Sequence, residues 1–232
     1  MSVAAILLCA GRGERLAGDV PKALVPLAGR PLFAWSLETL ERCAVIDAIV
    51  VVGPVRTLRE LLAASGLAVR KVAAWVEGGA ERQQSVARGL AAVPQGHDWI
   101  AVHDSARALV SEDVITRAIA AAREHGAAIA AVPLADTLKR VEGGAITGTP
   151  PREGLWCAQT PQVFRRDWLE AAHAAATGVT TDDAALVEAI GHRVHVAEGD
   201  PMNFKITTPG DLALAGSWLG RTRGAGSLSQ ES

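Results

Sequence analysis

Short, wholly apolar runs recur along this chain, and most of them are followed by a segment with helical spacing. The first run, Val3–Cys9, is continuous and leads into a glycine-rich loop. Runs without alternation are typical of strands buried on both faces of a parallel sheet. Parallel strands require long crossover connections, which are usually helices. The pattern therefore predicts an α/β fold, with a Rossmann-like, mostly parallel sheet and helices on both of its faces.

The same reading assigns the remaining elements. The further predicted strands are Ala48–Val52, Val69–Val76, Trp99–Val102, Ala127–Val132 and Arg193–Ala197. The predicted helices are Pro31–Leu40, a segment containing Leu58, Leu61 and Leu62, Glu81–Ala92, Ser111 to about His125, Phe164–Ala176, Thr181–Ile190 and Pro209–Leu219. Pro at a first helical turn and Ser at an N-cap are favourable starts. We expect one domain over residues 1–219 and a disordered, Gly/Ser-rich tail over residues 220–232.

The strand–helix rhythm is interrupted once, after Pro133. Short β-like runs surround Glu142-Gly143-Gly144, which is a hairpin signal. We interpret residues 133–155 as a β-arm that leaves the main sheet and is a candidate dimerisation element.

Composition narrows the class of partner. The chain has 232 residues, a net charge of −2 and an aromatic fraction of 4%. It lacks the basic excess of a nucleic-acid or anionic-membrane protein, and stacking platforms for single strands are scarce. The apolar run Val3–Ala10 is too short to span a bilayer. Three cysteines without a CxxC pair suit reduced thiols. We expect a cytoplasmic enzyme that binds neither nucleic acid nor membrane.

The loop after the first run, Cys9–Leu16, allows backbone amides to approach phosphate oxygens. A plain strand-to-loop turn is the alternative interpretation. Leu16 stands where the dinucleotide fingerprint requires Gly or Ala, which disfavours an NAD-dependent dehydrogenase. Arg15 and Lys22 place two cations near the carboxyl end of the first strand, where doubly wound sheets bind ligands. Such cations would neutralise charge at a phosphorus under attack, although two solvated surface cations remain the alternative.

Several motifs resemble those of the sugar-nucleotidyltransferases, and in particular the 2-C-methyl-D-erythritol 4-phosphate cytidylyltransferases. The resemblance covers nearly the whole chain, and its strength lies in the order of the motifs. They are Gly11-x-Gly13-x-Arg15-Leu16 with Pro21-Lys22, Gly78-Gly79-Ala80-Glu81-Arg82-x-x-Ser85-Val86, Val102–Arg107, Asp136–Arg140, Leu155–Phe164, Thr181-Asp182-Asp183 and Asn203–Thr207.

The resemblance implies that the 4-phosphate of a polyol attacks the α-phosphorus of CTP and that pyrophosphate leaves. The residues that match the family's catalytic positions are Arg15, Lys22, Arg152 and Lys205. Those that match its CTP-binding positions are Ala10, Gly11, Gly13, Gly79, Ala80, Ser85 and Asp104. Those that match its polyol-phosphate positions are Arg107, Thr137, Arg152 and Lys205.

Two further implications concern a metal and a second subunit. Asp104 matches the carboxylate that holds Mg²⁺, a hard cation that prefers oxygen ligands. A cap for the turn after its strand is the alternative role. The resemblance also implies a homodimer formed through the arm, in which Thr137 and Arg152 serve the neighbouring site. Ala80 and Ala108 depart from the usual family residues, which are polar or acidic at the first position and Pro at the second.

Three functions remain in view. The first is cytidylyl transfer to 2-C-methyl-D-erythritol 4-phosphate in non-mevalonate isoprenoid precursor synthesis. The second is the closely related ribitol 5-phosphate cytidylyltransferase activity, which shares most of these motifs. The third is a non-catalytic nucleotide-binding domain on the same fold, which the retained set Arg15, Lys22, Asp104 and Lys205 disfavours.

Overall fold

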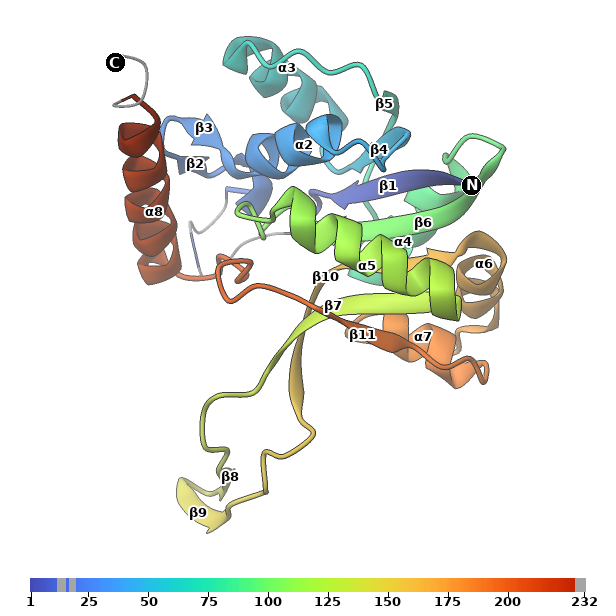
Figure 1. Cartoon of the computed structure of the whole chain (residues 1–232), viewed down its shortest axis with the longest axis vertical. Helices are drawn as coiled ribbons and strands as arrows, with labels where there is room; N and C mark the ends of the chain where they lie inside the picture. The colour runs from blue at the N-terminus through green and yellow to red at the C-terminus, as the bar shows by residue number, and fades with distance from the viewer. Residues whose placement is uncertain (12–15, 17–19, 228–232) are drawn as a thin grey trace.

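The computed structural model describes residues 1–11, 16 and 20–227, with the backbone alone for residues 222–227. Within these residues a seven-stranded sheet forms the centre of the molecule, in the order β11-β7-β10-β6-β1-β4-β5 (Figure 1). Neighbouring strands are parallel except at β10, which runs antiparallel to both β6 and β7. The predicted fold class, a mostly parallel α/β sheet, is confirmed.

The bounds of the elements are as follows. The strands of the main sheet are β1 (Ser2–Leu8), β4 (Ala48–Val52), β5 (Val72–Val76), β6 (His97–Asp104), β7 (Ala127–Pro133), β10 (Trp156–Arg165) and β11 (His195–Glu198). Two small hairpins pair β2 (Pro26–Leu27) with β3 (Arg30–Pro31) and β8 (Arg140–Glu142) with β9 (Ala145–Gly148). The helices are η1 (Lys22–Leu24), α2 (Leu32–Arg42), α3 (Val55–Ser65), α4 (Arg82–Ala91), α5 (Glu112–His125), α6 (Arg166–Ala175), α7 (Asp183–Ala189) and α8 (Pro209–Ser227).

Both faces of the sheet are covered, which explains why its strands are apolar throughout. Val3, Ala5 and Leu7 of β1 pack with α2, α3 and α5, whereas Ala4 and Ile6 pack on the opposite face with α4, α6 and α7. Burial of each large apolar side chain contributes about 1.5–3 kcal/mol relative to exposure. The two layers hold the strands in fixed register, so that the carboxyl ends of β1, β4, β5 and β6 meet at one edge.

Strand β10 corrects the sequence prediction, which left Trp156–Gln162 unassigned and began a helix at Phe164. The helix begins only at Arg166. Pro and polar residues are rare in a central strand, because Pro cannot donate to the ladder. Here the pairing register of β10 with β7 shifts between Ala158 and Gln162. Gln162 is buried, and its Oε1 accepts hydrogen bonds from the amides at the start of α7. Hydrogen bonds from α7 therefore stabilise a strand that its own sequence does not favour.

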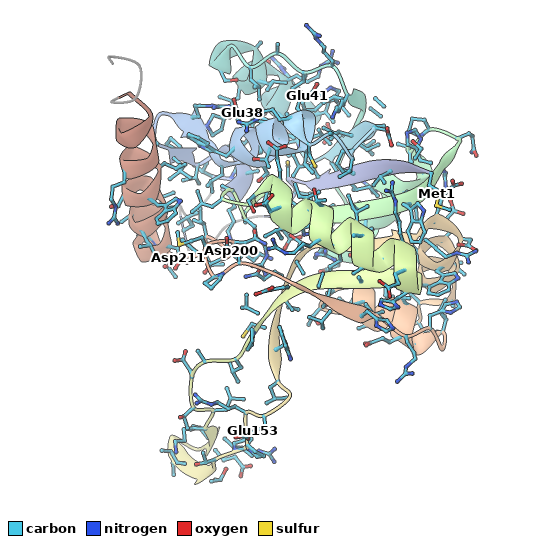
Figure 2. All side chains as sticks on the ribbon, in the orientation of Figure 1. Met1, Glu38, Glu41, Glu153, Asp200 and Asp211 are labelled. Atoms are coloured by element: carbon cyan, nitrogen blue, oxygen red, sulfur yellow. The ribbon has the colours of Figure 1, made fainter. Side chains whose placement is uncertain are left out.

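The interruption after Pro133 is a hairpin, as the sequence predicts. Strands β8 and β9 pair antiparallel around Gly143 and Gly144, whose φ angles of 56° and 83° are those of a tight turn that glycine favours. The hairpin projects well away from the body of the molecule (Figure 1). Figure 2 shows the arm around Glu153 standing clear of the densely filled layers.

The C-terminal helix corrects a second expectation. Helix α8 continues to Ser227, whereas the sequence pattern predicts that it ends at Leu219. Residues 228–232 lie outside the described part of the chain. No helix among the described residues combines the length and the apolar character needed to cross a membrane.

Candidate active site

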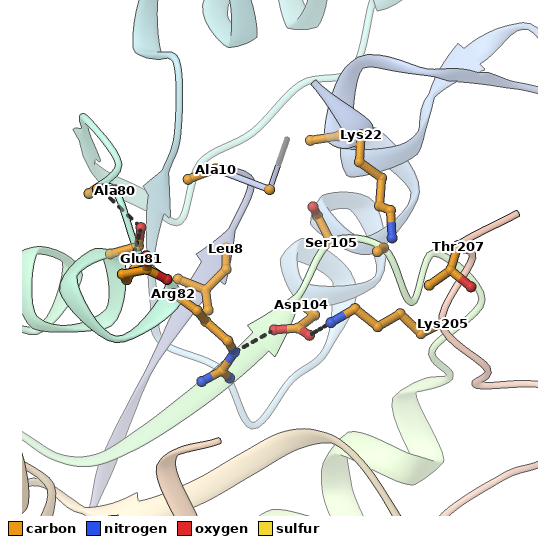
Figure 3. Close-up of a pocket in the computed structure, with 15 residues that line it drawn as sticks. Leu8, Ala10, Lys22, Ala80, Glu81, Arg82, Asp104, Ser105, Lys205 and Thr207 are labelled. Atoms are coloured by element: carbon orange, nitrogen blue, oxygen red, sulfur yellow. Dashed lines mark hydrogen bonds and ion pairs between the residues drawn. The ribbon is translucent and has the colours of Figure 1, made fainter. Parts of the chain in front are cut away.

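A pocket of about 530 Å³ lies at the carboxyl edge of the sheet (Figure 3). Its size is that of a small-molecule site. The register of the sheet builds it, because Leu8 at the end of β1 pairs with Val52 on one side and Asp104 on the other. The wall residues include Ala10, Gly11, Lys22, Gly79, Ala80, Glu81, Arg82, Ser85, Asp104, Ser105, Lys205 and Thr207.

Asp104, the last residue of β6, lies between two cations in this pocket. Arg82 Nε is 3.2 Å from its Oδ1, and Lys205 Nζ is 2.7 Å from its Oδ2 (Figure 3). Burial raises the pKa of Asp104, but the charges of Arg82 and Lys205 outweigh it and hold this pKa well below its usual range. The carboxylate is therefore ionised at neutral pH.

The loop before α4 is fixed by side chains of that helix. The amide of Gly79 donates to Ser85 Oγ at 3.0 Å, and the amide of Ala80 donates to Gln84 Oε1 at 2.9 Å. Glu81 and Gln84 form a capping box at the start of α4. Ser85 is buried, and its hydroxyl group orders this loop.

Lys22 enters the pocket from η1, a single turn that follows Pro21. Its backbone amide donates to the Gly11 carbonyl at 3.1 Å, which joins the loop after β1 to this turn. Its side chain points into the pocket, on the same side as Lys205 and Thr207 (Figure 3).

Arg82, the first residue of α4, connects the pocket to the layer behind it. Its Nη1 donates a hydrogen bond to Asp183 Oδ2 at 2.7 Å, and its Nε donates one to Asp104 Oδ1. Asp183 lies at the start of α7 and also contacts His173 Nε2 at 3.0 Å. Lys22, Arg82 and Lys205 thus bring three cations to a pocket whose described lining also holds two carboxylates, Asp104 and Glu81.

Comparison with known proteins decides the family. The model of the IspD family, 2-C-methyl-D-erythritol 4-phosphate cytidylyltransferase, matches residues 3–221. The chain belongs to this family. A relative of that name from Geobacter metallireducens is 44% identical over 229 residues, which cover 94% of this chain and 98% of the relative. One from Frankia casuarinae is 45% identical over 221 residues, covering 94% of this chain and 82% of the relative.

Solved structures agree. The crystal structure of the enzyme of that name from Thermus thermophilus is 37% identical with a TM-score of 0.77, covering 95% of this chain and 100% of the other. The structure from Francisella tularensis is 28% identical with a TM-score of 0.80, covering 94% and 99%. The family is one of cytidylyltransferases, and the chain is accordingly a nucleotidyltransferase.

The pocket unites most of the residues predicted for the nucleotide and the chemistry. The predicted residues that line it are Ala10, Gly11, Lys22, Gly79, Ala80, Ser85, Asp104 and Lys205. Gly13 and Arg15 lie outside the described residues. Three others are not among the residues lining the pocket. Arg107 donates to the carbonyls of Asn203 and Ala158, and Arg152 donates to the carbonyl of Ala135 in the arm, where Thr137 also lies exposed.

Arg82 is the charged pocket residue with the most contacts to carboxylates among those that the sequence analysis did not predict; Glu81, Ser105 and Thr207 also line the pocket and were not predicted. Arg82 stands in the quoted motif Gly78–Val86, yet its partners lie 22 and 101 residues away along the chain. A positively charged side chain in the first turn of a helix is unfavourable, because the N-terminal end of the helix dipole is also positive. That mismatch was the available signal.

Proposed function

We propose that this protein transfers the cytidylyl group of CTP to 2-C-methyl-D-erythritol 4-phosphate and releases pyrophosphate, in isoprenoid precursor synthesis. The observation that carries the proposal is the convergence of Lys22, Arg82 and Lys205 around Asp104 at the carboxyl edge of the sheet. Both substrates are phosphate anions. A chain whose net charge is −2 concentrates positive charge at the place where these phosphates would meet.

The reaction is an in-line displacement at phosphorus. An oxygen of the 4-phosphate forms a bond to the α-phosphorus of CTP, while the bond from that phosphorus to the bridging oxygen breaks. The electron pair leaves with pyrophosphate. Lys22 and Lys205 extend into the pocket and would offset the negative charge on the phosphoryl oxygens as the transition state forms. Arg15 is proposed to act with Lys22.

Asp104 is suited to hold a divalent cation together with the nucleotide. The described residues contain no group of three or more His, Cys, Asp or Glu side chains that could hold a metal. Mg²⁺ commonly binds through one or two carboxylates together with phosphate oxygens of the substrate, so this single carboxylate in a phosphate-binding pocket fits. When bound, Mg²⁺ would withdraw charge from those oxygens. We propose that removing divalent cations with EDTA abolishes turnover.

Recognition of the base is assigned to the loop Gly79–Ser85. The amides of Gly79 and Ala80 are already hydrogen-bonded to side chains of α4. Ala80 presents only a methyl group. The loop carbonyls and the shape of the wall would therefore distinguish cytosine, and this loop would do so without rearranging.

The arm is proposed to join two chains into a homodimer. Val141 and Ile146 are 54% and 64% exposed on the hairpin, and Trp156 at its base is 46% exposed. Apolar side chains exposed together on a projecting hairpin suit contact with a second copy. Arg152 and Thr137, which are remote from their own pocket, would then reach the neighbouring one. A cytoplasmic location is also proposed, supported by the three unpaired cysteines.

The activity is tested with purified protein, CTP and Mg²⁺. Pyrophosphate should be released with 2-C-methyl-D-erythritol 4-phosphate and much less with ribitol 5-phosphate, and Lys22→Ala should lose turnover. The opposite substrate preference, or full turnover by Lys22→Ala, would overturn the proposal.

The shared site is tested by complementation. Arg152→Ala and Lys22→Ala chains should each be inactive when assayed separately, whereas a refolded mixture should contain dimers in which one pocket keeps both residues. About a quarter of the wild-type activity should return with random pairing in a twofold dimer. No recovery, or a monomeric mass by light scattering, would contradict the proposed dimer.

A further inference from the structure

Arg82 differs from the other cations of the pocket in how it is held. Its guanidinium spans two carboxylates that come from separate elements, Asp104 at the end of β6 and Asp183 at the start of α7. The side chain of Arg82 is 24% exposed, whereas that of Lys205 on the other side of Asp104 is 43% exposed. A planar fork with two anchored donors has far less freedom than an ammonium on a flexible stem.

The anchor behind Arg82 is buried and does not reach the pocket. The side chain of Asp183 is 1% exposed and lies against Arg82 and His173. Its backbone amide donates to Gln162 Oε1 at 3.1 Å, so the backbone of Asp183 is held as well. His173, on α6, is itself almost fully buried. Two helices on one face of the sheet thereby fix the position of a charge at the edge of the sheet.

We infer that Arg82 is a positioning residue for Asp104, and that the buried pair Asp183–His173 holds it in that role. The inference rests on the proposed function and deepens it. Because Asp183 retains the guanidinium, Arg82 keeps its place when a nucleotide enters and Lys205 turns toward phosphate. The Asp104 carboxylate then keeps one fixed partner and one fixed orientation throughout the reaction.

The choice of variants follows from the burial. Removing Arg82 altogether would leave Asp183 buried with an uncompensated charge, which is strongly destabilising. Arg82→Lys keeps the charge but cannot span both carboxylates. Its matched control is Arg166→Lys, because Arg166 is 17% exposed, pairs with Glu170 and lies outside the pocket. His173→Leu removes the contact to Asp183, and His173→Gln restores an N–H donor.

The measurements are kcat, the KM for CTP, the thermal midpoint, and the affinity for CTP by calorimetry with Mg²⁺ and with EDTA. Arg82→Lys should fold and lower kcat by about 10- to 100-fold, with a much smaller change in KM. It should also reduce the gain in CTP affinity that Mg²⁺ gives the wild type. His173→Leu should lower kcat, His173→Gln should recover most of it, and Arg166→Lys should leave kcat unchanged.

Three results would overturn the inference. They are a wild-type kcat in folded Arg82→Lys, a rise in KM without a fall in kcat, and a loss in Arg166→Lys equal to that in Arg82→Lys. A wild-type protein without turnover overturns the proposed function instead. A wild type that turns over beside an unaffected Arg82→Lys overturns only the positioning role.

Discussion

Gly78 lies where the loop after β5 passes the loop after β1, and Gly78→Ala tests how closely these two walls of the pocket are joined. A β-carbon added at Gly78 would lie 2.4 Å from the β-carbon of Ala10 and 3.5 Å from Ser85 Oγ. Favourable contacts between carbon atoms lie at about 3.5–4.0 Å. Neither β-carbon can rotate away, because each is attached directly to the backbone, so one loop must move by about 1 Å or more.

The size of the effect follows from that displacement. Forcing an extra carbon into a packed site costs about 1–3 kcal/mol of folding free energy. For a chain of this length each kcal/mol lowers the thermal midpoint by about 2–4 °C. Ala10 and Gly79 both line the pocket, and a shift of about 1 Å can reduce catalysis by as much as 10²-fold. We expect Gly78→Ala to lower both the thermal midpoint and kcat/KM for CTP.

The assay is pyrophosphate release at several CTP concentrations, together with thermal denaturation followed by circular dichroism. Gly178→Ala is the matched control, since a β-carbon at Gly178 would meet nothing within 4 Å. Unchanged stability and unchanged kcat/KM in Gly78→Ala would refute the close approach of the two loops. A lower midpoint with unchanged kcat/KM would refute the idea that the contact shapes the nucleotide site.

Three further predictions concern buried polar groups. Burial lowers the pKa of His103 from 6.5 to about 4. As the pH falls, the imidazole is therefore protonated in the unfolded chain before it is protonated in the folded protein. Up to about 3 kcal/mol of stability is lost between pH 6.5 and pH 4. Urea titrations should show this slope and a flatter one in His103→Gln, and identical slopes would contradict it. Ser85→Ala leaves the Gly79 amide without its acceptor, which should cost about 1–3 kcal/mol and raise the KM for CTP; an unchanged KM in steady-state assays would count against the loop's role. Burial raises the pKa of Cys9 to about 12 and also raises that of Cys43. In a Cys157→Ala background no thiol should therefore react with Ellman's reagent at pH 8 before unfolding, and rapid reaction would contradict the burial of these two thiols.

Local patterns were sufficient for the α/β class, for the hairpin at Gly143 and for the edge of the sheet where the pocket lies. Continuous apolar runs need cover on both faces, and paired glycines need no long-range partner to turn. The motif around Lys22 and Asp104 could likewise be placed, because residues that follow parallel strands gather at the carboxyl edge.

Local sequence patterns could not predict strand β10 or the role of Arg82. Gln162 is tolerated in a central strand only because the amides of α7 meet it there. The role of Arg82 depends on its ion pairs with Asp104 and Asp183, which lie 22 and 101 residues away along the chain. The order of the strands and the packing of the helices bring these residues together. The sequence by itself determined the α/β class and most of the strands, and it predicted a binding site at the carboxyl edge of the sheet. Tertiary structure decided which charges face one another, because hydrogen bonds and ion pairs depend on distances of a few ångströms that spacing along the chain does not set.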